Sequence, residues 1–200
     1  MTCRKSYFNE AAKAWDSRYF TPKLVTFLEK LVPTLNLKLG DNVLDVGTGT
    51  GILIPFLLRV IGPSGTITAI DYAPQMIQIC RAKYAHLKNV FIRLHDVENL
   101  HLPPQSFNAV TCFGLFPHLE HKERTLRSLN HVLKLGGSLI IAHALSSEEI
   151  RSHHTNRSLP VGCDVLPKKS QMKRLLKSTG YTQIQIKDEP GCYLCQSTKP

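Results

Sequence analysis

The stretch from Val43 to Gly51, VLDVGTGTG, constrains the fold of this chain more than any other. Four residues with strand character lead directly into a turn with glycine at every second position. Apolar residues then recur at the spacing of one helix face, at Ile52, Leu53, Phe56, Leu57, Val60 and Ile61. A strand, a tight turn and a helix in succession place backbone N–H groups and a helix N-terminus against a ligand. Glycine is needed there because a Cβ atom would collide with the ligand or forbid a positive φ angle.

A second acidic residue follows at the distance expected for a nucleotide-binding unit. Asp71 ends the next apolar run, Thr66 to Ile70, and lies 20 residues after Gly51. A carboxylate at this position accepts hydrogen bonds from the hydroxyl groups of a ribose. The pair of features therefore predicts a cofactor that contains a nucleoside.

The spacing of the glycines narrows the kind of cofactor. Dinucleotide-binding folds use G-x-G-x-x-G, whereas Gly47, Gly49 and Gly51 are evenly spaced and are preceded by Asp45. An acidic residue inside the turn would repel a pyrophosphate. The turn instead suits a ligand that carries a positive charge or an amino group.

Asp45 and the alternate glycines resemble motif I of the class I methyltransferases that use S-adenosylmethionine. The resemblance extends roughly from Phe8 to Leu194. It is closest to the UbiE-like group, the quinone C-methyltransferase relatives. It implies that the glycine loop packs under the methionine part and the ribose, and that Asp71 binds both ribose hydroxyls. It also implies that Tyr72 and Met76 line the adenine and that Asp96 and Val97 bind its amino group. The residues expected to bind this cofactor are Asp45, Gly47, Thr48, Gly49, Gly51, Asp71, Tyr72, Met76, Asp96, Val97 and Phe113.

Two further segments resemble landmarks of this family. Residues 107–112 (FNAVTC) resemble its fourth strand, which usually begins with Phe-Asp, so Asn108 is a departure. Residues 131–141 (HVLKLGGSLII) resemble the end of a helix, a Gly-Gly turn and the fifth strand. These landmarks are specific for the cofactor and not for the substrate.

Alternating strands and helices predict an α/β fold with a parallel, doubly wound sheet, here the Rossmann-like class I methyltransferase fold with seven strands and an antiparallel C-terminal hairpin. We expect one domain, 1–200, made of an N-terminal helical lid (1–38), a cofactor-binding core (39–145) and a substrate-side segment (146–200). The expected strands are 43–46, 66–70, 90–94, 108–113, 137–142, 181–186 and 191–194, and the expected helices are 7–19, 24–31, 52–61, 74–85, 122–133 and 168–178.

The first expected helix resembles the lid of the family. Tyr7, Trp15, Asp16 and Tyr19 are its candidates for closing over the cofactor and the substrate. The alternative is that Phe8 and Trp15 only dock the helix on the core.

Composition limits the setting in which such a domain works. No apolar run approaches the roughly 20 residues of a membrane-spanning helix, and no secretory leader follows Met1, so we expect a cytoplasmic protein with reduced cysteines. The net charge of +10 is compatible with a nucleic-acid or acidic-lipid surface. The densest basic run, residues 168–177, is equally consistent with the solvated face of an amphipathic helix.

Histidines at the ends of strands are the candidates for catalysis. His118 follows the fourth strand and His143 the fifth, and His154 comes shortly after. These imidazoles permit a general base for a phenol, a thiol or an activated carbon. They also permit a bound metal or metalloid, or ordinary hydrogen bonding to local backbone. We assign His118, His143 and His154 to the catalytic set and no residue to a metal.

The function predicted from these features is methyl transfer from S-adenosylmethionine to a small-molecule acceptor. One alternative is a non-catalytic cofactor-binding regulator or partner subunit. Another is a tRNA or rRNA methyltransferase. Enzymes that methylate exocyclic amines of bases carry [Asn/Asp/Ser]-Pro-Pro-[Tyr/Phe] after the fourth strand to hold a flipped base, but this chain has Cys112-Phe113-Gly114-Leu115 there. The sequence leaves open the acceptor atom and the choice between a monomer and a homodimer.

Overall fold

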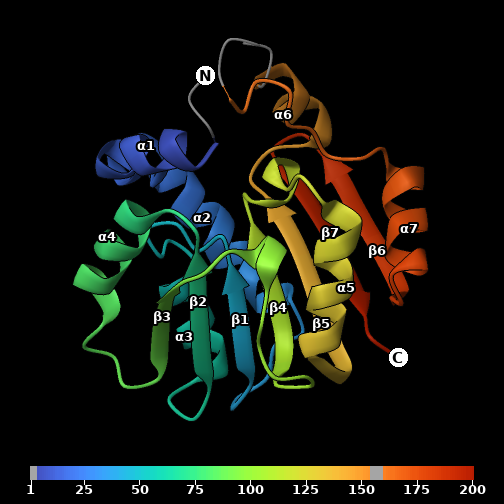
Figure 1. Ribbon diagram of the computed structural model, residues 1–200, viewed down its shortest axis with the longest axis horizontal. Coiled ribbons are helices and arrows are strands. Elements are labelled where there is room, and N and C mark those ends of the chain that lie inside the picture. Colours follow the sequence, from blue (N-terminus) through green and yellow to red (C-terminus); the bar gives the residue numbers. More distant parts are fainter. Residues whose placement is uncertain (1–3, 154–159) are drawn as a thin grey trace.

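In the computed structural model, which describes residues 4–153 and 160–200, seven strands form one sheet in the order β3-β2-β1-β4-β5-β7-β6. All neighbouring strands are parallel except β7, which runs antiparallel to both β5 and β6. The expected fold class is thereby confirmed (Figure 1). The strands are β1 (Asn42–Val46), β2 (Thr66–Asp71), β3 (Val90–Leu94), β4 (Phe107–Phe113), β5 (Leu133–His143), β6 (Thr182–Glu189) and β7 (Cys192–Thr198).

Helices cover both faces of the sheet, and further helices lie at its upper edge (Figure 1). Within the described residues, no helix combines the length and the apolar character needed to cross a membrane. The helices are α1 (Arg4–Tyr19), α2 (Pro22–Leu31), α3 (Ile54–Ile61), α4 (Pro74–Tyr84), α5 (Lys122–Val132), α6 (Ser147–His153) and α7 (Lys169–Ser178), with short 3₁₀ turns at η1 (Val32–Thr34), η2 (Val97–Asn99) and η3 (Phe116–His118).

The alternation of side chains along each strand divides the apolar core into two layers. In β1, Val43 packs with α2, α3 and α4 on one face of the sheet. Leu44 and Val46 point the other way and pack with α5 and α7. Both faces of the parallel strands are covered, so apolar residues of β1 point to both sides of the sheet. Its polar residues are Asn42, at its start, and Asp45.

The strand order reverses direction between β1 and β4, which pair with each other in the middle of the sheet. Connections from these two strands leave in opposite directions, so a crevice opens beyond their carboxyl ends. Helix α1 lies above this edge (Figure 1). The fold therefore directs attention to the residues that follow β1, β2, β4 and β5.

Several boundaries differ from the sequence-based expectation. Helix α1 begins at Arg4, earlier than residue 7, and helix α3 begins at Ile54, later than residue 52, because the glycine turn continues to residue 53. Strand β5 begins at Leu133, which pairs with Phe107, and the register shifts between this pair and the next one, Ala109 with Ser138. The Gly-Gly turn expected at residue 136 therefore lies within β5.

Helix α6 was not expected, although the sequence carries its signature. The hydroxyl of Ser146 accepts a hydrogen bond from the N–H of Glu149, and the Glu149 carboxylate accepts one from the N–H of Ser146. This reciprocal pair is a capping box, S-x-x-E, at the start of a helix. The Glu149 carboxylate also accepts from the N–H of Gly191, and so fixes α6 to the β6–β7 turn.

We expect the substitution Leu57→Ala to lower the free energy of unfolding by about 3 kcal/mol, because Leu57 is fully buried between α3 and the sheet and its loss leaves a cavity. Urea denaturation of the purified protein measures this change. The matched control is Leu135→Ala, at a side chain that is 68% exposed, which should change stability by no more than about 0.5 kcal/mol. Equal effects of the two substitutions would contradict the described packing.

Candidate active site

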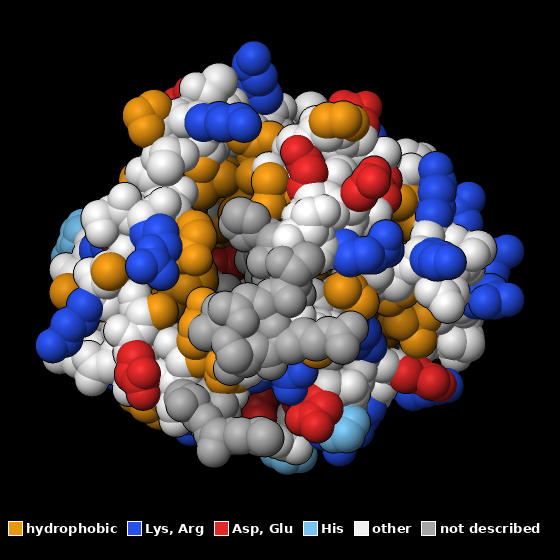
Figure 2. Space-filling model, turned by 90° about the horizontal axis from the view of Figure 1, so that it is seen from above, with side chains coloured by type: hydrophobic (Ala, Val, Ile, Leu, Met, Phe, Trp, Pro, Cys, Tyr) orange, Lys and Arg blue, Asp and Glu red, His pale blue; other side chains and the backbone are white. Residues whose placement is uncertain are grey.

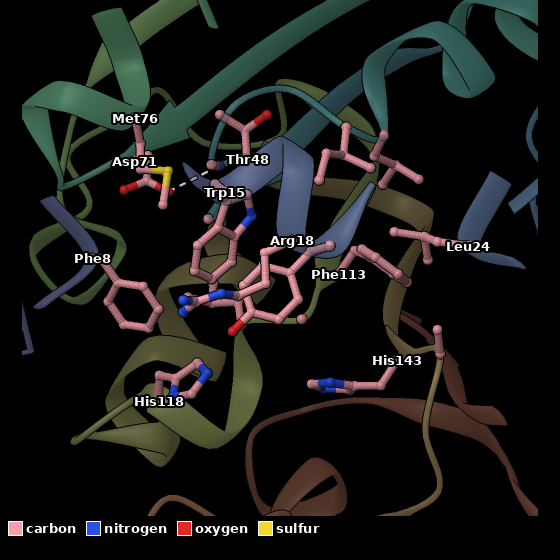
Figure 3. A pocket seen from close by; sticks show the side chains of 18 of the residues that line it. Phe8, Trp15, Arg18, Leu24, Thr48, Asp71, Met76, Phe113, His118 and His143 are labelled. Atoms are coloured by element: carbon pink, nitrogen blue, oxygen red, sulfur yellow. Dashed lines mark hydrogen bonds between the residues drawn. The ribbon is translucent and has the colours of Figure 1, made fainter. Parts of the chain in front are cut away.

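A cavity of about 420 Å³ opens at the carboxyl ends of the central strands. Its floor is the glycine turn after β1 together with the ends of β2, β4 and β5, and its roof is formed by α1 and the start of α2. Figure 2 looks down on this edge and shows hydrophobic side chains gathered around a hollow. Figure 3 shows Trp15 and Arg18 of α1 together with His118 of η3 and His143 of β5 around it.

The glycines of the turn have different tasks, although each has a positive φ angle. A Cβ atom on Gly47 would meet Leu115, and one on Gly51 would meet Tyr84 and Cys80, so these two glycines permit close packing. A Cβ atom on Gly49 would meet no atom closer than 3.9 Å and would project beside Trp15 and Met76. Gly49 therefore presents bare backbone to the cavity, whereas Gly51 does not line it.

Asp71, at the end of β2, holds the glycine turn in place. Its carboxylate accepts hydrogen bonds from the N–H of Gly49, at 2.9 Å, and from the N–H of Ala73, at 2.9 Å. Burial raises the pKa of Asp71, and the hydrogen bonds from backbone N–H groups act in the opposite direction. The carboxylate lines the cavity and sits where the sequence predicts a ribose-binding residue.

Asp45, in β1, is the other carboxylate of the floor. Its Oδ1 accepts a hydrogen bond of 2.7 Å from the Thr111 hydroxyl, while its Oδ2 has no hydrogen-bond partner among the residues that the structure describes. Burial raises the pKa of Asp45 to about 6, although the hydroxyl groups of Thr48 and Thr111 oppose this shift. An incompletely satisfied carboxylate facing a cavity suits a ligand atom that carries positive charge.

The remaining residues predicted to bind the cofactor divide between two hollows. Thr48, Tyr72, Met76 and Phe113 line the first cavity. Asp96 and Val97 line an adjoining hollow of about 430 Å³ on the β3 side, which shares Gly47, Asp71 and Tyr72 with the first. The structure thus brings the predicted set together along one continuous path, with Gly51 beneath it.

Helix α1 is fastened over these hollows by polar contacts and by aromatic packing. Asp16 accepts a hydrogen bond from the Thr50 hydroxyl and pairs with Lys83. The Asn9 side chain accepts from the N–H of Gln75. The Phe8 ring packs edge-on against Trp15, with 5.8 Å between ring centres. Of the residues proposed as a lid, Trp15 and Tyr19 line the first cavity, whereas Asp16 serves to fasten the helix.

The two described histidines of the predicted catalytic set both line the first cavity. His118, in η3, has its Nδ1 atom 2.9 Å from a carboxylate oxygen of Asp164. His143, at the end of β5, is buried and lies edge-on to Tyr193. His154 lies outside the described residues. In the described part of the chain, no three histidine, cysteine or acidic side chains form a group able to hold a metal ion.

Asp164 is a site residue that sequence reasoning missed. It precedes α7 and is buried, and its carboxylate accepts hydrogen bonds from Arg4 as well as meeting His118. Burial acts to raise the pKa of Asp164, but the hydrogen bonds from His118 and Arg4 outweigh it and hold the pKa well below its usual range. No local pattern marks this residue, because its partners lie 46 and 160 positions away in the sequence.

Comparison with known proteins agrees with this geometry. Residues 43–137 match the family model described as a methyltransferase domain. The ubiquinone/menaquinone biosynthesis C-methyltransferase UbiE of Pseudomonas paraeruginosa is 37% identical over 106 residues, which are 51% of this chain and 41% of that protein. Over about half of its length the chain is similar to class I S-adenosylmethionine-dependent methyltransferases of the UbiE-like group. The match spans well under half the length of these curated relatives.

Solved structures share the fold over nearly the whole methyltransferase chain. A S-adenosylmethionine-dependent methyltransferase from Aquifex aeolicus is 23% identical, with a TM-score of 0.74 over 96% of this chain and 98% of that one. The Haemonchus contortus phosphoethanolamine N-methyltransferase 2, solved with S-adenosylhomocysteine, is 15% identical, with a TM-score of 0.79 over 98% of this chain and 58% of that one. At these identities the likeness concerns the fold.

The floor of the cavity fits S-adenosylmethionine, the cofactor of this family. Asp45 offers a carboxylate oxygen without a described partner to a positively charged group. Gly49 leaves room that a Cβ atom would fill, and Asp71 offers a carboxylate for ribose hydroxyls. Asp45, Gly49 and Asp71 are therefore the residues that we expect to hold this cofactor, with Tyr72, Met76, Asp96 and Val97 toward its adenine.

We expect Asp71→Ala to weaken the binding of S-adenosylhomocysteine by about 2 kcal/mol or more, which is about 30-fold, because charge-assisted hydrogen bonds are lost and the glycine turn loses its anchor. Titration calorimetry measures this affinity. The control is Asp41→Ala, at a carboxylate that accepts from the N–H of Lys38 away from either hollow. Unchanged affinity in Asp71→Ala would contradict the role of Asp71.

The affinity for S-adenosylhomocysteine should fall as the pH falls through the pKa of Asp45, about 6. Below this pH Asp45 is protonated and no longer attracts a cationic group, so we expect about tenfold weaker binding at about pH 5 than at about pH 7. Calorimetry over this range tests the expectation. The variant Asp45→Asn removes this carboxylate, and a slope that persists in the variant would contradict the assignment.

Proposed function

We propose that this chain is catalytic and methylates a small-molecule acceptor that binds between the cofactor residues and the two histidines. The single observation that carries the proposal is the shared cavity: Asp45, Asp71, His118 and His143 all line one hollow. Bound S-adenosylmethionine supplies an electrophilic methyl group. The protein has to align a nucleophilic atom with that group and to remove any proton that the nucleophile carries.

The side of the cavity nearest α2 suits a flat, apolar acceptor. Leu24 and Phe27 of α2 line it together with Phe113 of β4, and the rings of Phe27 and Phe113 lie 6.4 Å apart. The UbiE relatives act, by their names, as C-methyltransferases of ubiquinone and menaquinone biosynthesis. Both facts support an aromatic acceptor that carries a removable proton, such as a quinol or a phenol.

His118 is the proposed proton acceptor. Its Nδ1 atom faces the Asp164 carboxylate, so the proton on that nitrogen is donated to Asp164 and Nε2 carries the lone pair. Methyl transfer would break the sulfur–methyl bond of the cofactor and release S-adenosylhomocysteine, and Nε2 of His118 would take the proton that the acceptor atom loses. His143 lines the same cavity (Figure 3) and limits where the acceptor lies.

The densest basic run of the chain, on α7, does not support a nucleic-acid acceptor at the cavity. The basic side chains of α7 line neither hollow. Helix α7 lies beside β6 at the far end of the sheet (Figure 1), whereas the cavity lies beyond β1 and β4. We therefore favour a small molecule over tRNA or rRNA.

The test is incubation of the protein with S-adenosylmethionine that carries a labelled methyl group, together with hydroquinone, catechol or benzenethiol. We expect label in at least one of these probes and none in anisole, which has no removable proton on its heteroatom. His118→Gln should lower the rate by a factor of about 100 or more with unchanged affinity for S-adenosylhomocysteine. The control His131→Gln, on α5, should leave both unchanged.

Two results would overturn this proposal in different ways. Binding of S-adenosylhomocysteine without transfer to any probe would favour the non-catalytic cofactor-binding alternative. Transfer of label to total tRNA or rRNA, with none to the small molecules, would favour the nucleic-acid alternative.

A further inference from the structure

We propose that Asp164, oriented by Arg4, is a positioning residue that fixes the proton of His118 on Nδ1 and so keeps Nε2 as the proton acceptor. This inference rests on the proposed function, because it concerns how the proposed base is prepared. It assigns a role to two residues, Arg4 and Asp164, that lie outside the set predicted to bind the cofactor.

The arrangement joins three segments that are distant in the sequence. Arg4 is in the first turn of α1, His118 is in η3 after β4, and Asp164 lies in the loop before α7. The Asp164 side chain is only 3% exposed and that of His118 is 14% exposed. Burial of a carboxylate costs desolvation free energy, which hydrogen bonds and opposite charges have to offset. The two donors from separate elements meet this requirement.

Each atom of the Asp164 carboxylate has a defined partner. Oδ1 accepts from Nη2 of Arg4 at 2.6 Å, and Oδ2 lies 3.0 Å from Nε of Arg4 and 2.9 Å from Nδ1 of His118. The guanidinium group contains only donors, and an ionised carboxylate contains only acceptors. The contact with His118 is therefore a hydrogen bond only when Nδ1 carries the proton.

The ionised state of Asp164 is supported by the same contacts. Hydrogen bonds from His118 and Arg4 keep its pKa well below the usual range, in spite of burial. Lys122, which donates to the carbonyl groups of Pro117 and Leu119, adds a positive charge on the same side. Asp164 thus remains an acceptor for His118 at neutral pH.

Helix α1 contributes to the base from two positions. Arg4 bonds to Asp164, and one turn further along the Phe8 ring packs edge-on against His118, with 5.1 Å between ring centres. The roof of the cavity therefore also holds the base in its orientation. Seating of α1 and alignment of His118 are parts of one arrangement.

The substitution Asp164→Asn tests the proposal because Arg4 dictates how the new amide must turn. The Oδ1 position meets two donors of Arg4, Nη2 at 2.6 Å and Nε at 3.2 Å, whereas the Oδ2 position meets only Nε. The amide oxygen is therefore expected at the Oδ1 position, with the NH₂ group facing Nδ1 of His118. Nδ1 then becomes an acceptor and the proton moves to Nε2, which is the wrong tautomer for a base. Heteronuclear NMR of ¹⁵N-histidine-labelled protein with S-adenosylhomocysteine bound, at about pH 8, reports which nitrogen carries the proton.

We expect the wild-type His118 signal, identified by its loss in His118→Gln, to show the proton on Nδ1, and Asp164→Asn to show it on Nε2. In Arg4→Met the proton should stay on Nδ1. In the double variant the amide is free to turn either way, so both tautomers should be populated. The control Asp188→Asn, at a carboxylate that accepts from Ser147 on the β6 side, should leave the tautomer unchanged.

The proposal is overturned if wild-type His118 carries its proton on Nε2 or stays doubly protonated at this pH, results that do not depend on the folding of any variant. It is also overturned if Asp164→Asn binds S-adenosylhomocysteine within about threefold of the wild type and keeps the wild-type tautomer. The NMR measurement contains no methyl acceptor, so it does not depend on methyl transfer. Failure of transfer to the probes would contradict the proposed function without deciding which nitrogen of His118 carries the proton.

Discussion

The reversal of strand order between β1 and β4 is the constraint on which the rest of the structure depends. Parallel strands end at a common edge, and the chain leaves β1 and β4 in opposite directions, so that edge contains a crevice that no helix of the two layers fills. The groups that line it come from the residues at or just after the strand ends: the glycine turn after β1, Asp71 of β2, Phe113 of β4 and His143 of β5. The candidate functional residues therefore lie at the strand ends, outside the two packed layers of the core.

Helix α1 closes this crevice with little apolar burial of its own. Ala12 is its one fully buried residue in the described chain, and Phe8 and Trp15 pack half-buried beside it. Polar contacts of Arg4, Asn9 and Asp16 complete its attachment to the domain. Contacts of this kind are weaker than core packing, and elements held by them open locally at lower free energy than the core does. The roof of the cavity is therefore the part of the molecule best suited to admit ligands while the sheet stays intact.

The sequence carries most of the fold because its signals are local. The glycine turn, Asp71 and the alternation of apolar runs specify β1, β2 and the helix between them, and the structure has these elements within a few residues of the predicted bounds. Helix α6 was missed although its capping box is equally local, since a short polar helix lacks apolar periodicity.

The partners of the site were harder to foresee than its fold. The position of His118 after the fourth strand marks it as a candidate, but nothing near it in sequence points to Asp164. That contact exists because the loop before α7 and the first turn of α1 both return to the same edge of the sheet. Contacts between distant segments follow from the packed chain, and a single sequence does not show them.

The buried carboxylates of the site differ in how completely the protein satisfies them. Two backbone N–H groups face Asp71, and Arg4 and His118 face Asp164, whose pKa falls well below the usual range. Asp45 has one hydroxyl on Oδ1 and no described partner on Oδ2, and its pKa rises to about 6. An unsatisfied buried polar atom costs about 1–3 kcal/mol, and such costs persist where a ligand removes them. The Asp164 carboxylate is satisfied within the protein, which fits the positioning role proposed for it, whereas Asp45 keeps an oxygen without a described partner, which fits the cofactor contact proposed for it.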